Sequence, residues 1–302
     1  MPHSVARPQK TREFQNYALD STRWNNFPFR DDDVVIGTWA KTGTTWVQQI
    51  VGQLIFGGAD GIAVGDISPW VDMRIAPLED ILALVEAQEH RRFLKTHLPL
   101  DALPRWESVK YIYVGRDARD VVWAAHAHQR DFSPLAYELF NTLPGRVGPP
   151  MEVPHPDVRE YYRIWLERDG YPAWPFWSHV QSWWNARSLP NVLLVHFANL
   201  KADMAGEIRR IADFLVIQID EAAWPNIVEH CGFAYMKRNA DKAMGAGAAL
   251  FNTGAKNFIN KGTNERWRDV LTPAEIAWAD EFAAANLTPD CARWLATGKM
   301  PQ

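Results

Sequence analysis

The sequence predicts a single α/β domain with a central, mostly parallel β-sheet flanked by helices on both faces. Two observations predict it. Short runs of consecutive apolar residues alternate with stretches of helical spacing, and such runs are typical of strands buried on both faces of a sheet. The chain has 302 residues, 47% hydrophobic and 23% charged, which excludes a disordered or fibrous chain. We find no internal repeat and expect one domain over 1–302, with an N-terminal extension at 1–20.

The first unit of the domain is a strand, a loop and a helix. Val34–Gly37 is a β-branched apolar run that predicts a buried strand, and Trp46–Ile55 has the spacing of a helix. Residues 40–46 between them read Ala-Lys-Thr-Gly-Thr-Thr-Trp, and we call this segment the anion loop. Its place before a helix predicts P-loop-like binding of an anion at the helix N-terminus.

The residues of the anion loop suit that role. Gly43 lets the backbone approach a ligand closely, Lys41 adds a positive charge, and Thr42, Thr44 and Thr45 offer hydroxyl donors. The loop is not a Walker A motif, because Thr44 and not a lysine follows Gly43. The alternative is an ordinary helix N-terminus with a lysine nearby by chance.

Two further strand–helix units follow along the chain. Lys110–Val114 predicts a strand and Ala118–Gln129 the helix after it, and Asn191–Phe197 followed by Ala205–Leu215 repeats the pattern. In the last helix the apolar residues share one face, which we expect to pack in the core: Ile208, Ile211, Ala212 and Leu215.

Charged residues with candidate roles stand at two strand ends. His97 follows the apolar pair Phe93–Leu94, and Lys95 shares its face in an extended chain. A base beside a cation suits the deprotonation of a hydroxyl with transfer of an anionic group, although a lone histidine after a strand is more often structural. Arg116, where the next strand becomes a helix, has the fork that binds phosphate oxygens, and a surface salt bridge is the alternative.

The composition excludes several classes of partner. The net charge is −4, so no overall positive field attracts nucleic acid, and an anionic ligand needs a local cationic cluster. The two cysteines, Cys231 and Cys291, make neither a disulfide framework nor a metal site. No run approaches 18 apolar residues and the polar N-terminus lacks a secretory signal, so we expect a cytoplasmic protein with no membrane span.

Together these segments resemble the cytosolic sulfotransferase family over about residues 20–280. That family moves a sulfuryl group from 3′-phosphoadenosine 5′-phosphosulfate (PAPS) to a hydroxyl or amine, and 3′-phosphoadenosine 5′-phosphate (PAP) is the other product. The resemblance rests on five motifs that occur in the expected order: the anion loop 40–46, Lys95-Thr96-His97-Leu98-Pro99, the segment 113–121 with Arg116, His179-Val180-Gln181-Ser182-Trp183-Trp184, and Phe258-Ile259-Asn260-Lys261-Gly262.

The resemblance implies a role for each candidate residue. His97 is the base that takes the acceptor's proton, Lys41 neutralises the leaving phosphate oxygen, and Lys95 braces the sulfuryl or phosphate oxygens, while backbone N–H groups of residues 43–45 complete the anion site. No metal is implied. The remaining residues hold the nucleotide: Trp46 and Phe233 lie on the two faces of the adenine, and Arg116 with the turn Asn260-Lys261-Gly262 holds the 3′-phosphate.

The chain departs from the family at three positions that hold the nucleotide in the family. The helix serine that helps to hold the 3′-phosphate is Ala124, the arginine of the Arg-Lys-Gly turn is Asn260, and the tyrosine near the adenine is Phe197. A hydrogen bond to a charged group contributes about 1.5–3 kcal/mol, so losing two would weaken donor binding about 100-fold or more unless Lys256 or another side chain substitutes. Pro273 also replaces a valine of the dimer motif, so the oligomeric state stays open, with a homodimer as one option.

Two stretches rich in proline and glycine are predicted to be irregular loops, an acceptor loop at 130–157 and a lid at 240–262. Their apolar residues fit a small hydrophobic acceptor, an aromatic or alicyclic alcohol. The candidates for acceptor contact, for which simple packing is an equal alternative, are Trp70, Phe132, Tyr137, Phe140 and Phe251.

Two other functions compete with sulfuryl transfer. A P-loop kinase or nucleotide hydrolase would need the missing Gly-Lys pair and a magnesium site. A non-catalytic nucleotide-binding homologue is suggested by Ala124 and Asn260. The 15 tryptophans do not decide between these functions: Trp46 is expected to contact a ligand, Trp183 and Trp184 to pack in the core, and Trp165, Trp174 and Trp177 to do either.

Overall fold

Four parallel strands form the centre of the molecule in the computed structural model, which describes residues 10–301. Their order in the sheet is β2-β1-β3-β4. The three strands predicted above are confirmed, and a further strand leads into His97. The bounds of the strands are β1 Val34–Thr38, β2 Phe93–Thr96, β3 Lys110–Gly115 and β4 Val192–His196.

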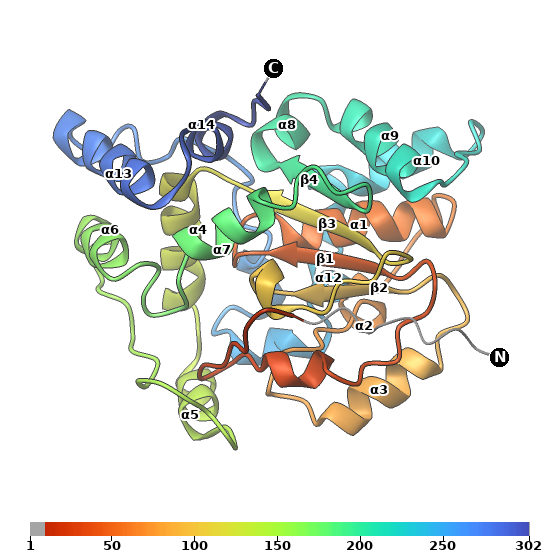
Figure 1. The fold of residues 1–302 in the computed structure, drawn as a ribbon, viewed down its shortest axis with the longest axis horizontal. Coiled ribbons are helices and arrows are strands. Elements are labelled where there is room, and N and C mark those ends of the chain that lie inside the picture. Colours follow the sequence, from red (N-terminus) through yellow and green to blue (C-terminus); the bar gives the residue numbers. More distant parts are fainter. Residues whose placement is uncertain (1–9, 302) are drawn as a thin grey trace.

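Helices cover both faces of the sheet, as the continuous apolar strands predict (Figure 1). Val34 and Ile36 of β1 pack on one side with α1, α9 and α10, whereas Val35 points to the other side, where α4, α7 and α14 pack. The close fit on that second side needs glycine, because a Cβ at Gly37 would come within 2.2 Å of the Trp183 ring. None of the helices in residues 10–301 is long and apolar enough to cross a membrane.

The α-helices include the three that the sequence predicts, at α1, α4 and α9, and the apolar face predicted for α9 is buried. Their bounds are α1 Thr44–Ile55, α2 Val64–Ile67, α3 Leu78–Glu86, α4 Ala118–Arg130, α5 Pro134–Thr142, α6 Val158–Glu167, α7 Trp177–Trp184, α8 Phe197–Ala202, α9 Met204–Leu215, α10 Trp224–Cys231, α11 Phe233–Arg238, α12 Ala240–Met244, α13 Pro273–Asn286 and α14 Pro289–Thr297. Four 3₁₀ turns are η1 Ser21–Trp24, η2 Leu100–Ala102, η3 Gly245–Leu250 and η4 Gly254–Asn257.

The prediction of two irregular loops is wrong in part. Helix α5 lies inside 130–157, since Ser133 caps its N-terminus and Pro134 occupies its first turn, where proline is favoured. The stretch 240–262 contains α12 and two 3₁₀ turns, η3 and η4, in place of an extended loop. Proline and glycine often interrupt regular structure, but in these two stretches they mark where short helices begin and end.

The tryptophans fall mainly in the core. Trp183 and Trp184 are fully buried, as expected, and so are Trp165 and Trp177, for which the sequence left two alternatives. Both cysteines are free and buried.

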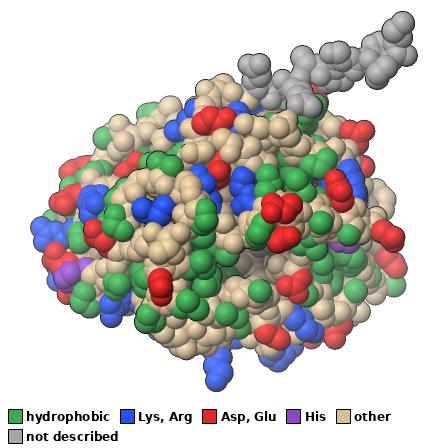
Figure 2. All heavy atoms as spheres, turned by 90° about the horizontal axis from the view of Figure 1, so that it is seen from below, with side chains coloured by type: hydrophobic (Ala, Val, Ile, Leu, Met, Phe, Trp, Pro, Cys, Tyr) green, Lys and Arg blue, Asp and Glu red, His purple; other side chains and the backbone are tan. Residues whose placement is uncertain are grey.

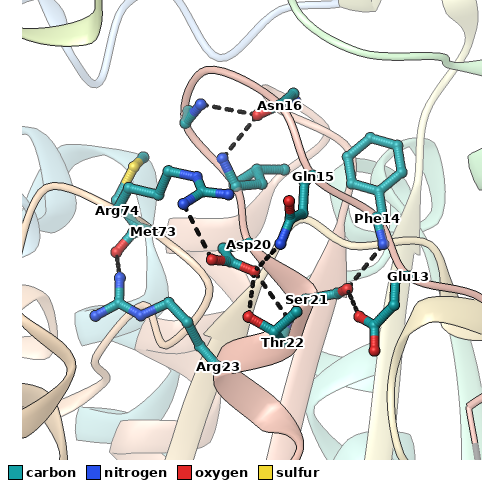
Figure 3. Close-up of polar contacts among 12 residues, drawn as sticks. Glu13, Phe14, Gln15, Asn16, Asp20, Ser21, Thr22, Arg23, Met73 and Arg74 are labelled. Carbon is teal, nitrogen blue, oxygen red and sulfur yellow. Dashed lines mark hydrogen bonds and ion pairs between the residues drawn. The ribbon is translucent and has the colours of Figure 1, made fainter. Parts of the chain in front are cut away.

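Residues 10–20 of the predicted N-terminal extension pack along the loop after Trp70; residues 1–9 lie outside the described part of the chain. Figure 3 shows the contacts that hold them: Asp20 pairs with Arg74 at 3.0 Å, and the Arg23 guanidinium donates to the Met73 carbonyl. Side chains from both segments line the large cavity described below: Tyr17, Ala18, Met73 and Ile75. The extension is therefore a wall of the site.

Candidate active site

A cavity of about 1280 Å³ lies at the carboxyl edge of the sheet, where ligands bind in open parallel α/β sheets. β1 ends at the anion loop, β2 at His97 and β3 at Arg116, and because these strands are neighbours, the three segments meet at one edge. The charged lining is unequal, with two aspartates, Asp66 and Asp131, against seven cations: Lys41, Lys95, Arg116, Arg130, Lys201, Lys261 and Arg266. The cavity suits an anionic ligand.

The anion loop turns sharply before α1. Lys41 and Gly43 have φ values of 68° and 123°, and the second is a conformation that favours glycine. Thr44 and Thr45 line the cavity, and the Thr44 hydroxyl also lies 2.7 Å from the Thr38 hydroxyl. Thr42 is the exception among the predicted donors, because its hydroxyl donates to the Trp39 carbonyl at 3.0 Å and it is not among the lining residues.

The Lys41 ammonium lies between a histidine and an aromatic ring. Its Nζ is 3.3 Å from Nδ1 of His128 and 4.7 Å from the centre of the Phe258 ring. Burial, followed by the charges of Arg116 and Lys95, lowers the pKa of Lys41 to about 7. An added anion would restore the charged form, since no carboxylate in the described residues pairs with Lys41.

His97 is buried and fixed by the backbone of β1. Its Nδ1 is 2.7 Å from the Thr38 carbonyl, so Nδ1 carries the hydrogen and Nε2 is left as the proton acceptor. Burial, then the charge of Lys95, holds the pKa of His97 well below its usual range, although the bond to Thr38 opposes this. The ring lines the cavity against Trp70 and Trp174, with centroids 4.5 Å and 5.6 Å away. The imidazole is therefore neutral at pH 7.

Lys95 and His97 share a support in Asp72. This buried carboxylate accepts hydrogen bonds from the Trp70 indole at 2.9 Å and from the His97 backbone at 3.3 Å, and burial raises its pKa. Trp70 in turn lies under Lys95, whose Nζ is 4.0 Å from the ring centre. Burial lowers the pKa of Lys95 to about 8, and Asp72 opposes that shift.

Arg116 links two parts of the cavity wall. Its guanidinium donates to the carbonyls of Lys41 at 3.0 Å and Thr263 at 3.1 Å, and both Nε and Nη2 donate to the Asn264 side chain, at 3.2 Å and 3.0 Å. Four of its five N–H groups thus have protein partners. It lies 4.1 Å above the Phe197 ring, and burial lowers its pKa to about 10.

The residues predicted to hold the nucleotide lie on the same cavity wall. The Trp46 indole donates to the Cys231 carbonyl at 2.9 Å and packs edge-on against Phe197 at 5.3 Å. Phe233 lies against Gly262, where a Cβ would come within 2.7 Å of its ring. The structure also brings Ala124, Asn260 and Lys261 to the lining, whereas Lys256, named above as a substitute phosphate ligand, is exposed and outside it.

Aromatic and aliphatic side chains line the rest of the cavity. Four of the five predicted acceptor residues are among them: Trp70, Phe132, Phe140 and Phe251. Tyr137 is not, since its hydroxyl donates to the Gln129 carbonyl at 2.7 Å. In Figure 2 hydrophobic side chains gather over the middle of the lower face, the face that carries α2, α3 and the N-terminal segment.

Sequence reasoning missed several residues of the lining, among them His128 and Arg266. His128 lies one helical turn after Ala124, and that spacing on a helix was a signal that could have found it. Arg266 had no comparable signal. Among residues 10–301 no three His, Cys, Asp or Glu side chains are grouped to hold a metal.

A parallel sheet whose edge carries an anion loop, a buried imidazole and two half-buried lysines is typical of a transferase that moves an anionic group. The sulfotransferase domain family matches residues 31–289. A glycolipid sulfotransferase of Mycobacterium tuberculosis is 30% identical over 308 residues, covering 95% of this chain and 94% of that protein. Sulfotransferase 1A1 of Rattus norvegicus is 29% identical over 277 residues, covering 88% of each.

Solved structures agree with these relatives. Retinol dehydratase in complex with androsterone and the inactive cofactor PAP has a TM-score of 0.67 at 25% identity, covering 89% of this chain and 84% of that one. A mouse sulfotransferase complexed with PAP has a TM-score of 0.70 at 21% identity, covering 91% of each, and shows the same fold. The chain belongs to the sulfotransferase family and is a PAPS-dependent sulfotransferase.

Proposed function

We propose that this enzyme transfers the sulfuryl group of PAPS to the hydroxyl or amine of a small hydrophobic acceptor, with His97 as the base. The observation that carries the proposal is the state of His97. Its Nδ1 is engaged by the Thr38 carbonyl, and its neutral ring lines the cavity between the anion loop and the apolar walls. The free Nε2 is therefore ready to accept a proton at neutral pH.

The proposed reaction is an in-line displacement at sulfur. The acceptor oxygen forms a bond to sulfur, the bond from sulfur to the bridging oxygen of the 5′-phosphate breaks, and the acceptor's proton moves to Nε2 of His97. Lys41 offsets the negative charge left on that oxygen and Lys95 the charge on the sulfuryl oxygens. The products are a sulfate ester and PAP, and His97 then returns its proton to water.

The donor is held by groups that the cavity already orients. Backbone N–H groups of residues 43–45 at the start of α1 face the 5′-phosphosulfate. Trp46 and Phe233 lie on the two faces of the adenine, and Arg116 with the turn 260–262 contacts the 3′-phosphate. Of these, Arg116 has one N–H left for that contact, because the protein takes the others.

The acceptor is an aromatic or alicyclic alcohol in this proposal. A site for one drug-sized ligand is about 300–1,000 Å³, so a cavity of about 1280 Å³ accommodates donor and acceptor together. Phe132, Phe140 and Phe251 supply flat apolar walls. The mycobacterial relative is a glycolipid sulfotransferase by name, which makes a glycolipid hydroxyl the second class to test.

Radiolabelled PAPS, incubated with the purified protein and a panel of acceptors, tests the proposal. The panel holds phenols, sterols, linear alcohols and glycolipids, and the expected result is a labelled sulfate ester of at least one hydrophobic member. PAP binding without transfer to any acceptor would favour the non-catalytic homologue. Phosphate transfer from ATP that requires magnesium would favour the kinase.

A further inference from the structure

Arg266 is a cation of the cavity wall that has no hydrogen-bond or ion-pair partner among the described residues. It is half-buried, it lines the cavity, and it makes no hydrogen bond or ion pair with any other residue of 10–301. The arginine two positions later behaves differently, because Arg268 pairs with Glu265 at 2.8 Å and lies outside the lining. An unpaired guanidinium at a cavity surface is a ready site for an anion.

Arg266 also stands close enough to Arg116 for their charges to interact. Arg266 is one of the groups that lower the pKa of Arg116, after burial. Asp120 and Asp117 oppose this effect on the pKa of Arg116, but neither carboxylate lines the cavity. Asp117 pairs with Arg119 at 2.6 Å, Asp120 accepts the Glu265 backbone N–H at 2.6 Å, and none of the three acidic side chains lines the cavity.

The two arginines differ in what they can still bind. Four N–H groups of Arg116 donate hydrogen bonds to Lys41, Thr263 and Asn264, and these bonds fix the segment 263–264 to the anion loop. Arg266 follows that segment with its donors unused among the described residues. Both arginines line the same cavity, so a guanidinium held by the protein and one without a partner among residues 10–301 are exposed to the same space.

We propose that Arg266 binds the 3′-phosphate of the donor and makes the enzyme selective for a 3′-phosphorylated nucleotide. This inference rests on the proposed function, in which the anion loop takes the 5′-phosphosulfate and leaves one further anionic group to be held. Ala124 offers no hydroxyl on this wall and Asn260 no charge. Arg266, with Lys261 of the preceding turn, supplies cationic donors in their place.

Calorimetric binding of PAP and of AMP, which lacks the 3′-phosphate, tests this role in the full chain. The ratio of the two dissociation constants measures recognition of the 3′-phosphate alone. Arg266→Ala should weaken PAP binding about tenfold to about a hundredfold, since a hydrogen bond to a charged group is lost, and should change AMP binding by less than about threefold. Arg266→Lys should retain part of the selectivity, and Arg268→Ala, the matched control, should retain all of it.

The outcomes separate this inference from the proposed function. Unchanged selectivity in Arg266→Ala would overturn the role of Arg266 while leaving PAP as the bound nucleotide. An equal loss of PAP and AMP binding would also overturn it, because a purely structural role lowers both. Equal binding of PAP and AMP by the unmodified enzyme would overturn it as well. Failure to bind either nucleotide would overturn the donor site itself.

Discussion

The proposed function divides the cavity into a donor half and an acceptor half, and these two halves are built in different ways. The donor half consists of strand ends and the turns that follow them, where Thr38 fixes His97 and Arg116 fixes the backbone of Lys41. The acceptor half is assembled from separate segments: residues 17–18, the loop 70–76, the end of α4 with α5, and the stretch 244–251. The proposed reactive groups thus stand at the ends of strands, whereas the residues proposed to select an acceptor lie on the loops and helices that connect the strands.

The two halves also differ in what holds their side chains. In the donor half the groups are charged, and burial lowers the pKa values of Lys41 and Lys95, with nearby cations adding to the shift at Lys41. In the acceptor half aromatic rings pack on one another, such as Phe132 on Phe251 with centroids 5.0 Å apart. Substitutions in the first half should alter rate and nucleotide affinity, whereas those in the second should alter acceptor KM.

The largest expected effect belongs to His97, at the junction of the halves. His97→Ala should lower kcat about a hundredfold to about ten-thousandfold, because the acceptor proton loses its base. PAP affinity should stay nearly unchanged, since the proposed partner of His97 is the acceptor and not the nucleotide. Steady-state turnover and calorimetric PAP binding measure the two quantities.

His97→Asn serves as the control for folding, because its amide can still donate to the Thr38 carbonyl. It should lose turnover to a similar extent. Turnover close to that of the unmodified enzyme in either variant would remove His97 from the role of base.

Lys41→Met should have the next largest effect and should lower both rate and nucleotide affinity. Methionine keeps the length of the side chain and its packing near Phe258, while the charge that faces the leaving phosphate is lost. A hydrogen bond to a charged group is worth about 1.5–3 kcal/mol, so PAP affinity should fall about tenfold to about a hundredfold. Unchanged PAP affinity would show that Lys41 does not reach the phosphate.

The pH dependence of PAP binding also tests whether the charge of Lys41 pairs with the phosphate. The pKa of Lys41 is about 7 in the free protein, so above pH 7 most molecules must take up a proton before Lys41 can pair with an anion. PAP affinity should therefore fall as the pH rises from 7 to 9. Calorimetry at pH 8 in two buffers of different ionisation enthalpy should detect proton uptake, and Lys41→Met should reduce it. Lys95 should contribute less, because its proposed contact is to the sulfuryl oxygens that PAP lacks.

The sequence predicts the donor half better than the acceptor half, because the donor half consists of strand ends and the turns after them. Strands, the anion loop, His97 and Arg116 are local patterns, and neighbouring parallel strands bring their ends together without further information. Arg266 is close to Arg116 only through the fold, since 150 residues of chain separate them. The Thr42 hydroxyl donates to the Trp39 carbonyl instead of facing the cavity, and this orientation depends on the backbone conformation of the loop. Such details depend on tertiary contacts that periodicity does not encode.

Phe251→Ala tests the acceptor half and should have a moderate effect. The Phe251 ring packs on His128 at 4.8 Å and on Phe132 at 5.0 Å, and its removal takes away one apolar wall. Burying a large apolar side chain contributes about 1.5–3 kcal/mol, and this half-buried ring should supply the lower end, about a tenfold rise in acceptor KM. PAP affinity measured on the same sample should change less than twofold, and a matching loss of PAP affinity would contradict the division into halves.

Tyr137→Phe should have the smallest effect and marks the outer limit of the acceptor half. Its ring packs against Phe132 at 5.9 Å and its hydroxyl donates to the Gln129 carbonyl, but Tyr137 itself does not line the cavity. Loss of that hydrogen bond should lower the free energy of unfolding by about 0.5–1.5 kcal/mol and leave acceptor KM unchanged. Denaturant unfolding and steady-state kinetics measure the two. A changed acceptor KM at unchanged stability would mean that the Tyr137 hydroxyl contacts the acceptor. The acceptor site would then include residues behind those that line the cavity.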